Sequence, residues 1–218
     1  MADDEVPTRV RLLEAAVAVL AEGGWAAVTS RVVAERARAN NALVHYYFGS
    51  VEALRRAAVM HALERELEGP VAAILQAPGA LDGVLAAISG LTARGTGTPG
   101  QRVLMEALVQ GMRDEGMREE CATQIRMFRD LLTARLAEDQ AAGRLRADLA
   151  AADLSVVLTA LIDGLLLHAM LDPATDFTAP AAALVAALRP PTPPRQAPQE
   201  PPEGASDEGG DEDDPARF

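Results

Sequence analysis

The chain has 218 residues, of which 49% are hydrophobic and only 3% aromatic, so its core must be built largely from Ala, Leu and Val. Such a core favours packed helices over β-sandwiches. The net charge of −12 is unevenly distributed: residues 8–60 carry seven arginines against four glutamates, whereas residues 190–218 carry two arginines against eight acids. The overall charge therefore does not exclude nucleic-acid binding by the N-terminal segment. The single cysteine, Cys121, excludes an internal disulfide and a multi-cysteine zinc site.

Four helices are predicted in the N-terminal third. The first ends at Gly23-Gly24, and its apolar face comprises Val10, Leu13, Ala16, Val17 and Leu20. Thr29 can cap a second helix over 30–37, whose apolar residues are Val32, Val33 and Ala37, and Asn40 can cap a third over 41–48. Ser50 can cap a fourth helix from Val51 to about Glu68, which Gly69-Pro70 is expected to end.

The remainder of the chain is also predicted to be helical as far as about residue 190. The expected helices lie, with a loop at 92–100, at about 71–76, 80–91, 101–113, 116–141, 150–171 and 178–188. Beyond residue 190 the sequence consists largely of Pro, Gly and acidic residues and has no Leu, Ile or Val. Such a segment buries too little apolar surface to offset its ordering entropy, so residues 190–218 are predicted to form a disordered acidic tail.

The helix predicted at 150–171 is apolar on nearly every face. Its length suits a membrane span, but Asp163 at its centre costs about 2.5–3.5 kcal/mol on insertion scales, and His168 follows it. In a soluble protein, a helix that is apolar all round is buried all round. One face is therefore expected to pack on its own domain and the other on a partner chain.

The second and third predicted helices form a helix-turn-helix pattern. In DNA-binding proteins of this type, the first turn of the second helix of the motif enters the major groove. Here that turn begins with Asn40-Asn41, and Asn can bond adenine through two hydrogen bonds, while Ala or Leu can contact a thymine methyl group. His45, Tyr46 and Tyr47 lie one turn later, where their polar groups can reach phosphates.

Several residues of this N-terminal segment match the sequence pattern of a known family; they are Arg11, Ala15-Ala16, Gly24, Trp25, Thr29, Ala34, Ala37, Tyr46-Tyr47-Phe48, Ser50, Glu52 and Leu54. With these residues the segment resembles the N-terminal domain of the TetR family of transcriptional repressors. The stretch IDGLLLHAMLDP resembles the segment through which many members dimerise.

The resemblance implies an all-α fold in three parts. Residues 6–66 would form a helix-turn-helix DNA-binding domain, 67–189 a helical effector-binding and dimerisation domain joined to it by the fourth helix, and 190–218 the tail. It also implies the function: a cytoplasmic homodimer that binds a palindromic operator in double-stranded DNA and releases it when a small-molecule effector enters the C-terminal bundle.

The residues expected to contact DNA surround the second and third helices; they are Thr29, Ser30, Arg31, Arg38, Asn40, Asn41, Ala42, Leu43, His45, Tyr46, Tyr47, Ser50 and Arg55. Three positions depart from the family pattern. Arg38 stands where Gly is usual at the inter-helix turn, Val51 where a phosphate-contacting Lys is usual, and His45 where Tyr is usual. Arg38, Arg55 and Arg56 are candidates to supply the positive charge that this Lys would bring to a phosphate.

An effector cavity is expected inside the bundle, reached near the 92–100 loop. Its candidate lining residues are His61, Met105, Met112, Met127, Phe128 and His168. The candidate dimer interface consists of Phe128, Leu132, Leu136, Leu154, Val157, Leu161, Gly164 and Leu165. Trp25 is expected to fill space between the first and fourth helices.

Two other classes of function remain as alternatives. The first is a helical adaptor that keeps a degenerate helix-turn-helix and binds protein. The second is a small-molecule enzyme, which is disfavoured because the sequence has no GxSxG, HExxH, P-loop or GxGxxG motif in a strand–helix setting. The three histidines, at scattered positions, predict no metal site, no cofactor is expected, and the acidic N-terminus without an apolar run predicts no signal peptide.

Overall fold

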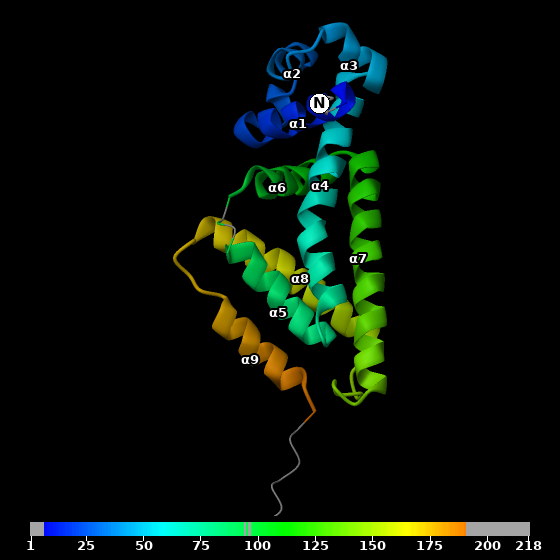
Figure 1. The fold of residues 1–218 in the computed structure, drawn as a ribbon, viewed down its shortest axis with the longest axis vertical. Helices are drawn as coiled ribbons and strands as arrows, with labels where there is room; N and C mark the ends of the chain where they lie inside the picture. Colours follow the sequence, from blue (N-terminus) through cyan, green and yellow to red (C-terminus); the bar gives the residue numbers. More distant parts are fainter. Residues whose placement is uncertain (1–6, 94, 96, 191–218) are drawn as a thin grey trace, which may run out of the picture.

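The computed structural model describes residues 7–93, 95 and 97–190, which form α-helices and one short 3-10 turn and contain no strand. The predicted all-α class is confirmed, whereas the predicted tail lies, apart from its first residue, outside the described residues. Figure 1 shows α1–α3 at one end of the molecule and α4 running from them into a bundle. The helices are α1 Thr8–Gly23, α2 Ser30–Arg36, α3 Asn41–Phe48, α4 Val51–Gln76, α5 Ala80–Ala93, α6 Pro99–Gly111, α7 Glu115–Ala141, α8 Ala151–Leu171 and α9 Thr178–Leu188.

The helix starts in the N-terminal third follow from local hydrogen bonds. Thr29 Oγ1 accepts from the Val32 backbone N–H at 3.3 Å, Asn40 Oδ1 from Ala42 at 2.8 Å, and Ser50 Oγ from Ala53 at 3.0 Å. Each side chain thus satisfies a backbone donor that the first helical turn leaves unpaired. The three predicted caps are confirmed.

The fourth helix is longer than predicted. It does not end at Gly69-Pro70 but continues to Gln76, so the separate helix expected at 71–76 is wrong. Pro70 removes one backbone hydrogen bond, a cost of about 3 kcal/mol in a helix interior. The last turns are nevertheless held by packing against α5, because Pro70 and Ile74 are both buried there. The expected boundary between residues 66 and 67 therefore falls inside one continuous helix.

A core at the N-terminal end joins α1, α2, α3 and the first half of α4, which we call the head. It contains fully buried residues such as Leu12 and Leu54, but it is closed by Val103 and Ala107 of α6 and Met117 of α7. A second core joins the rest of α4 to α5, α7, α8 and α9, which with α6 we call the bundle. The head therefore shares α6 with the bundle.

The apolar faces of the first two helices differ in part from the predicted ones. In α1 the buried face includes Leu12 and Val19, which were not in the predicted set, while Val10 and Val17 are only half-buried. In α2, Val33 is buried but Val32 is 42% exposed, because α2 contacts the rest of the head along one narrow face.

Asp139 of α7 joins three parts of the bundle. Its side chain is buried, and Oδ2 accepts from the backbone N–H of Ala80, the first residue of α5, at 2.7 Å. Oδ1 accepts from Nε and Nη2 of Arg144 at 3.0 and 2.6 Å. The carboxylate thus caps α5 and holds the turn that follows α7.

The contact between α4 and α5 requires a glycine. A Cβ atom at Gly83 would lie 2.6 Å from the Ile74 Cα atom, whereas one at Gly90, on the same helix, would meet nothing within 4 Å. We expect Gly83→Ala to lower the free energy of unfolding by about 1–3 kcal/mol, because the two helices must separate. The matched variant Gly90→Ala is expected to raise it by about 0.5–1 kcal/mol through backbone entropy. Denaturant unfolding followed by circular dichroism measures both, and two effects of the same sign would contradict this packing.

Candidate functional site

The turn between α2 and α3 contains a residue in the left-handed conformation. Arg38 has φ 51°, its N–H donates to the Glu35 carbonyl at 3.1 Å, and the Ala39 N–H donates to the Ala34 carbonyl at 2.9 Å. These bonds form a Schellman ending for α2, in which the left-handed position is usually Gly. A side chain there costs about 1 kcal/mol, so Arg38 is held in this conformation by the rest of the head.

The first turn of α3 presents small and polar side chains to solvent. Asn40 is used as the cap, whereas the Asn41 side chain is exposed and has no hydrogen bond to another described residue. Ala42 is exposed beside it and Leu43 is half-buried. Val44 is completely buried in the head core and so fixes which face of α3 points outward.

Aromatic side chains occupy the second turn of α3. Tyr46 is 79% exposed and packs edge-on against Tyr47, with ring centroids 5.0 Å apart. His45 Nδ1 lies 3.4 Å from the Gly49 carbonyl, and its ring is exposed. Phe48 is half-buried beneath the Arg9 guanidinium, 5.4 Å from the ring centroid, which links α3 to the start of α1.

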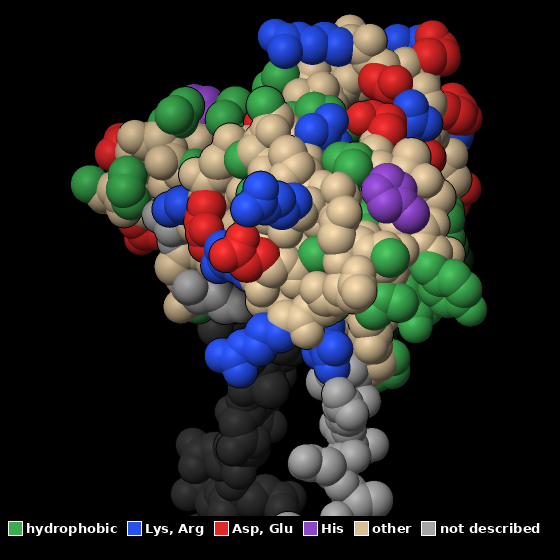
Figure 2. All heavy atoms as spheres, turned by 90° about the horizontal axis from the view of Figure 1, so that it is seen from above, with side chains coloured by type: hydrophobic (Ala, Val, Ile, Leu, Met, Phe, Trp, Pro, Cys, Tyr) green, Lys and Arg blue, Asp and Glu red, His purple; other side chains and the backbone are tan. Residues whose placement is uncertain are grey.

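Cationic side chains are spread over this end of the molecule, with acidic side chains beside several of them (Figure 2). Arg36 is bound by Glu22 through two bonds of 2.6 Å. Arg31 and Arg38 are exposed and have no ion pair with another described residue, so their charges are available to phosphates. Thr29 and Ser50 act as caps through their oxygens, and each hydroxyl hydrogen can still be donated to a phosphate.

The two other arginines considered for phosphate contact have different roles. Arg55, expected to contact DNA, is instead turned inward: Nε and Nη2 donate to the Val28 carbonyl at 3.1 and 2.8 Å, and its guanidinium lies 5.7 Å from the Trp25 ring centroid. Arg56 pairs with Asp114, the cap of α7, at 2.9 Å. Both guanidinium groups are held by protein partners, because α4 carries them into the junction between head and bundle.

The head and the bundle are also joined through Trp25, the only tryptophan of the chain. Its backbone N–H donates to Glu106 Oε1 of α6 at 3.1 Å, and the same oxygen accepts from Gln110 Nε2 at 3.1 Å. The Trp25 ring packs against the head core, as expected. A displacement of α6 would therefore also displace the residues at the end of α1.

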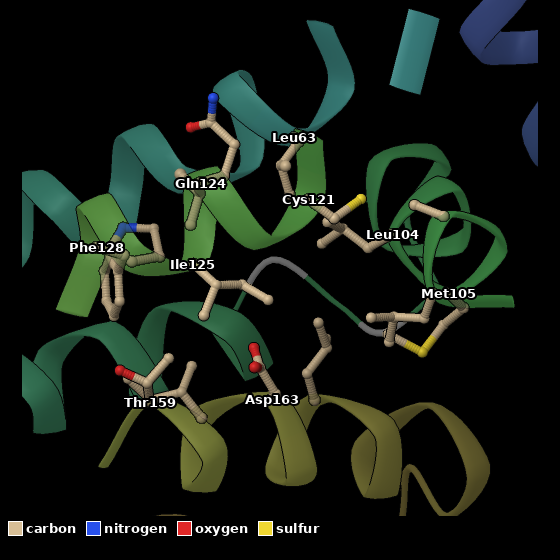
Figure 3. A pocket seen from close by; sticks show the side chains of 15 residues that line it. Leu63, Leu104, Met105, Cys121, Gln124, Ile125, Phe128, Thr159 and Asp163 are labelled. Carbon is tan, nitrogen blue, oxygen red and sulfur yellow. The ribbon is translucent and has the colours of Figure 1, made fainter. Parts of the chain in front are cut away.

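The bundle contains an apolar cavity of about 110 Å³ between α4, α6, α7 and α8 (Figure 3). Its walls are mainly hydrocarbon, and its polar groups come from Cys121, Gln124, Thr159 and Asp163. The apolar lining residues are Leu63, Leu67, Pro70, Leu104, Met105, Ala107, Leu108, Ile125, Phe128, Ile162 and Leu166.

Two sequence models match the chain. Residues 12–58 match the model described as bacterial regulatory proteins of the tetR family, and residues 101–189 match the BetI-type transcriptional repressor C-terminal model, so that together they span more than half of the chain. The chain belongs to the TetR family. It is a DNA-binding transcriptional regulator, and members of the family bind operator DNA and small-molecule effectors and form dimers. A comparison with curated protein sequences gives no match.

Solved structures share the TetR fold with this chain. Salmonella enterica GusR is 22% identical, with a TM-score of 0.72 and coverage of 86% of this chain and 98% of that one. A protein from Saccharomonospora viridis assigned as a transcriptional regulator, solved in complex with choline, is 20% identical, with a TM-score of 0.68 and coverage of 82% and 93%. The fatty acid degradation regulator FadR from Bacillus halodurans is 16% identical, with a TM-score of 0.64 and coverage of 84% and 95%.

The cavity of this TetR-family chain includes only part of the predicted lining. Met105 and Phe128 line it. His61 instead borders a separate polar hollow between α1, α4 and α6, and Met127 lies in a groove on the outer side of α4 and α7. Met112 is 75% exposed, and the exposed His168 contacts Phe177 edge-on. None of these four faces the cavity, because helical periodicity places them on other faces of their helices.

The cavity also differs from expectation in its polar residues and its position. Thr159, Gln124 and Asp163 line it but were not predicted as lining residues. None of the described residues in the segment at 92–100, which was expected to lie at the entrance, is among the lining residues. Desolvation by burial raises the pKa of the Cys121 thiol, and the charge of Glu120 adds to this effect, so the reactive thiolate form is disfavoured.

The eight candidate interface residues of the TetR-family chain divide into two groups. Phe128, Leu132, Leu136 and Leu154 are buried inside the protomer, because α7 and α8 pack against each other, so these four have no surface to offer a partner. The others, Val157, Leu161, Gly164 and Leu165, lie partly or largely exposed on α8.

The outer face of α8 is apolar. Val156, Val157, Leu167 and Leu171 are 44%, 61%, 43% and 78% exposed. In the part of the chain that the structure describes, α8 is the one helix long and apolar enough to cross a membrane by length and composition, and its inner face is packed in the bundle core. An exposed apolar face of this kind is unusual on a protein surface in contact with water.

Proposed function

We propose that this TetR-family protein is a homodimeric repressor that releases a palindromic operator when a small molecule occupies the bundle cavity. Residues 6–66 would bind DNA and residues 67–189 would bind the effector and the second subunit. The observation that carries the proposal is the double use of α6, which contributes Val103 and Ala107 to the head core and Leu104, Met105 and Leu108 to the cavity wall.

The fourth helix is shared in the same way. Its first half packs in the head core through Leu54 and Ala58, and its second half lines the cavity through Leu63, Leu67 and Pro70. A ligand shifts a conformational equilibrium only by its difference in affinity for the two states. An occupant of this cavity presses on the two helices that also shape the head, so it can favour an arrangement of the two heads that no longer fits the operator.

The polar contacts at the junction transmit a shift of these helices. The Trp25–Glu106 hydrogen bond ties α6 to the end of α1, and the Arg56–Asp114 ion pair ties α4 to α7. The choline complex of the Saccharomonospora viridis protein supports uptake of a small organic molecule by this fold.

We further propose that a second copy of the chain covers the outer face of α8. Ala160 and Gly164 stand four residues apart on this face, so that a partner helix can approach closely, and exposed Val157 and Leu171 flank them. Burying these side chains removes apolar surface from water, at about 25 cal/mol per Å². A dimer made through α8 would hold two heads in the fixed relation that a palindromic operator requires.

The proposal is tested by selecting duplexes from a random pool with the full-length protein at about 100 mM salt, where the Debye length is about 10 Å. We expect enrichment of a palindromic site whose affinity falls steeply with salt. Ligands found by protection of Cys121 from alkylation should change Trp25 emission and weaken binding to that site. If no duplex is enriched, the proposal of a DNA-binding repressor is wrong, and the protein-binding adaptor becomes the favoured function.

A further inference from the structure

We propose that the bundle cavity accepts an organic monocation with an apolar body, and that Asp163 is the counter-charge of its cationic group. This inference rests on the proposed effector role of the cavity and names the chemical class of the effector. It is carried by the position of one carboxylate among hydrocarbon walls, by an unpaired hydroxyl beside it, and by two glutamates along the groove that borders the cavity.

Among the residues that the structure describes, Asp163 is the only charged one that lines the cavity. Its carboxylate extends from α8 toward the side chains of α6 and α7 (Figure 3). Within the described residues it has neither a hydrogen bond nor an ion pair; the residue is exposed to water on one side, and on the other it adjoins apolar lining residues such as Ile162 and Leu166. This desolvation raises the pKa of Asp163, and the charge of Arg129 opposes the rise only in part.

A cationic group at this place would stabilise the carboxylate. A carboxylate that is partly removed from water is stabilised by an opposite charge close by, and this attraction is stronger beside apolar walls than in open water. The hydrocarbon walls, among them Ile125 and Leu166, suit an apolar body attached to that group. A neutral ligand would supply no charge to balance that of Asp163.

Thr159 lies one turn before Asp163 on α8. It is 4% exposed, and its Oγ1 atom has no hydrogen-bond partner among the described residues. A buried hydroxyl without a partner is unusual and points to a polar group supplied from elsewhere. Gln124 of α7 adds an amide to the lining. A ligand with one polar substituent near its cationic group would satisfy Thr159 as well.

The groove on the outer side of α4 and α7 borders the cavity. The two hollows share Leu67, Gln124 and Phe128, so these three side chains form the wall between them. Glu64 and Glu68, both exposed, line the outer groove. Their negative charges attract cations and repel anions, which favours this groove as the route by which a cationic ligand reaches Asp163.

The test compares three probes of similar size: benzyltrimethylammonium, its neutral carbon analogue neopentylbenzene, and the anion phenylacetate. Binding to the full-length protein is measured by calorimetry and by protection of Cys121, which lines the cavity, from N-ethylmaleimide. We expect the cation to bind about tenfold or more tightly than the neutral analogue, and the anion to bind weakest.

Variants assign the effect to the carboxylates. Asp163→Asn should weaken the cation about tenfold and leave the neutral analogue within about twofold, while the matched variant Asp153→Asn, on the same helix, should change neither. Asp163→Glu should retain the preference for the cation. Glu64→Gln with Glu68→Gln should slow association of the cation and reduce its salt dependence without affecting the neutral analogue.

Equal or tighter binding of the neutral analogue, an unchanged cation affinity in Asp163→Asn, or no protection of Cys121 by any probe would overturn the assignment. If Asp163→Asn fails to fold, the comparison of probes on the wild-type protein decides. Operator binding separates the two proposals. If only the neutral analogue releases the protein from DNA, the proposed ligand class is wrong and the proposed repressor function is supported. If the cation binds without affecting DNA binding, the proposed ligand class is supported and the proposed repressor function is wrong.

Discussion

Asn41→Ala is expected to weaken binding to the specific operator by about 1–3 kcal/mol, and to relax the preference at one base pair in each half-site. Asn41 is exposed on the first turn of α3, and its amide is not engaged by another described residue, whereas the neighbouring Asn40 is used as the cap. A free amide in this position can donate to and accept from one adenine, and alanine removes both bonds. The fold should be unaffected, because the Asn41 side chain is exposed.

Arg38→Ala should have a different signature. Arg38 is exposed at the turn before α3 and has no ion pair with another described residue, so we expect it to contact a phosphate. Its loss should weaken all duplexes alike and reduce the slope of log affinity against log salt by about one. Arg38→Gly is the control for strain: it removes the same charge but should raise the free energy of unfolding by about 1 kcal/mol, because φ is positive there.

Affinity measured at several salt concentrations, on the selected site and on single-base variants of it, distinguishes the two roles. The assignment of base and backbone contacts is wrong if Asn41→Ala leaves affinity and sequence preference unchanged while Arg38→Ala changes the preferred sequence. Unequal DNA affinities of Arg38→Ala and Arg38→Gly would show that backbone strain, and not charge alone, affects binding.

Gly164→Arg is expected to convert the dimer into monomers and to abolish cooperative binding to a palindrome. Within the protomer a Cβ atom at Gly164 meets nothing within 4 Å, so the longer side chain does not disturb the subunit itself. In the proposed dimer it would stand between two closely packed α8 helices and place a charge in an apolar interface. Since Arg has a higher helix propensity than Gly, the isolated subunit should be no less helical.

Analytical ultracentrifugation at micromolar concentration measures the oligomeric state, with circular dichroism as the check on folding. Gly90→Arg is the matched control, because a Cβ atom there also meets nothing within 4 Å, but Gly90 lies on α5, away from the proposed interface. Leu165→Asp should act as Gly164→Arg does. A wild-type protein that sediments as a monomer would contradict the proposed dimer. If both α8 variants still form dimers, the dimer interface does not lie on α8.

Features that depend on a few neighbouring residues could be predicted from the sequence. Thr29, Asn40 and Ser50 cap the helices that follow them, because a cap is made within three residues. The end of α4 could not be predicted in this way. Gly69-Pro70 is a strong local stop signal, but burial of Ile74 against α5 outweighs it, and α5 is contributed by a later part of the chain.

The candidate sites show the same limit. Apolar spacing indicates that Leu132 and Leu136 face a partner, but it does not say whether that partner is the same chain or another, and both proved to be buried inside the protomer. Likewise, the sequence position of Arg55 suggests a phosphate contact, but in the structure its guanidinium donates to the Val28 carbonyl. Asp163 and Thr159 line a hollow whose existence depends on the packing of four helices.

Along α6, residues that pack in the head core alternate with residues that line the cavity, and this affects how the sequence of the protein can change in evolution. Val103 faces the head while Leu104 and Leu108 face the cavity, so a lineage can exchange effectors by replacing the cavity side chains and still recognise the same operator. Ala107 is the one residue of α6 that belongs to both the head core and the cavity wall. A larger residue there would alter both at once, so we expect orthologues to vary at 104 and 108 and to retain a small residue at 107.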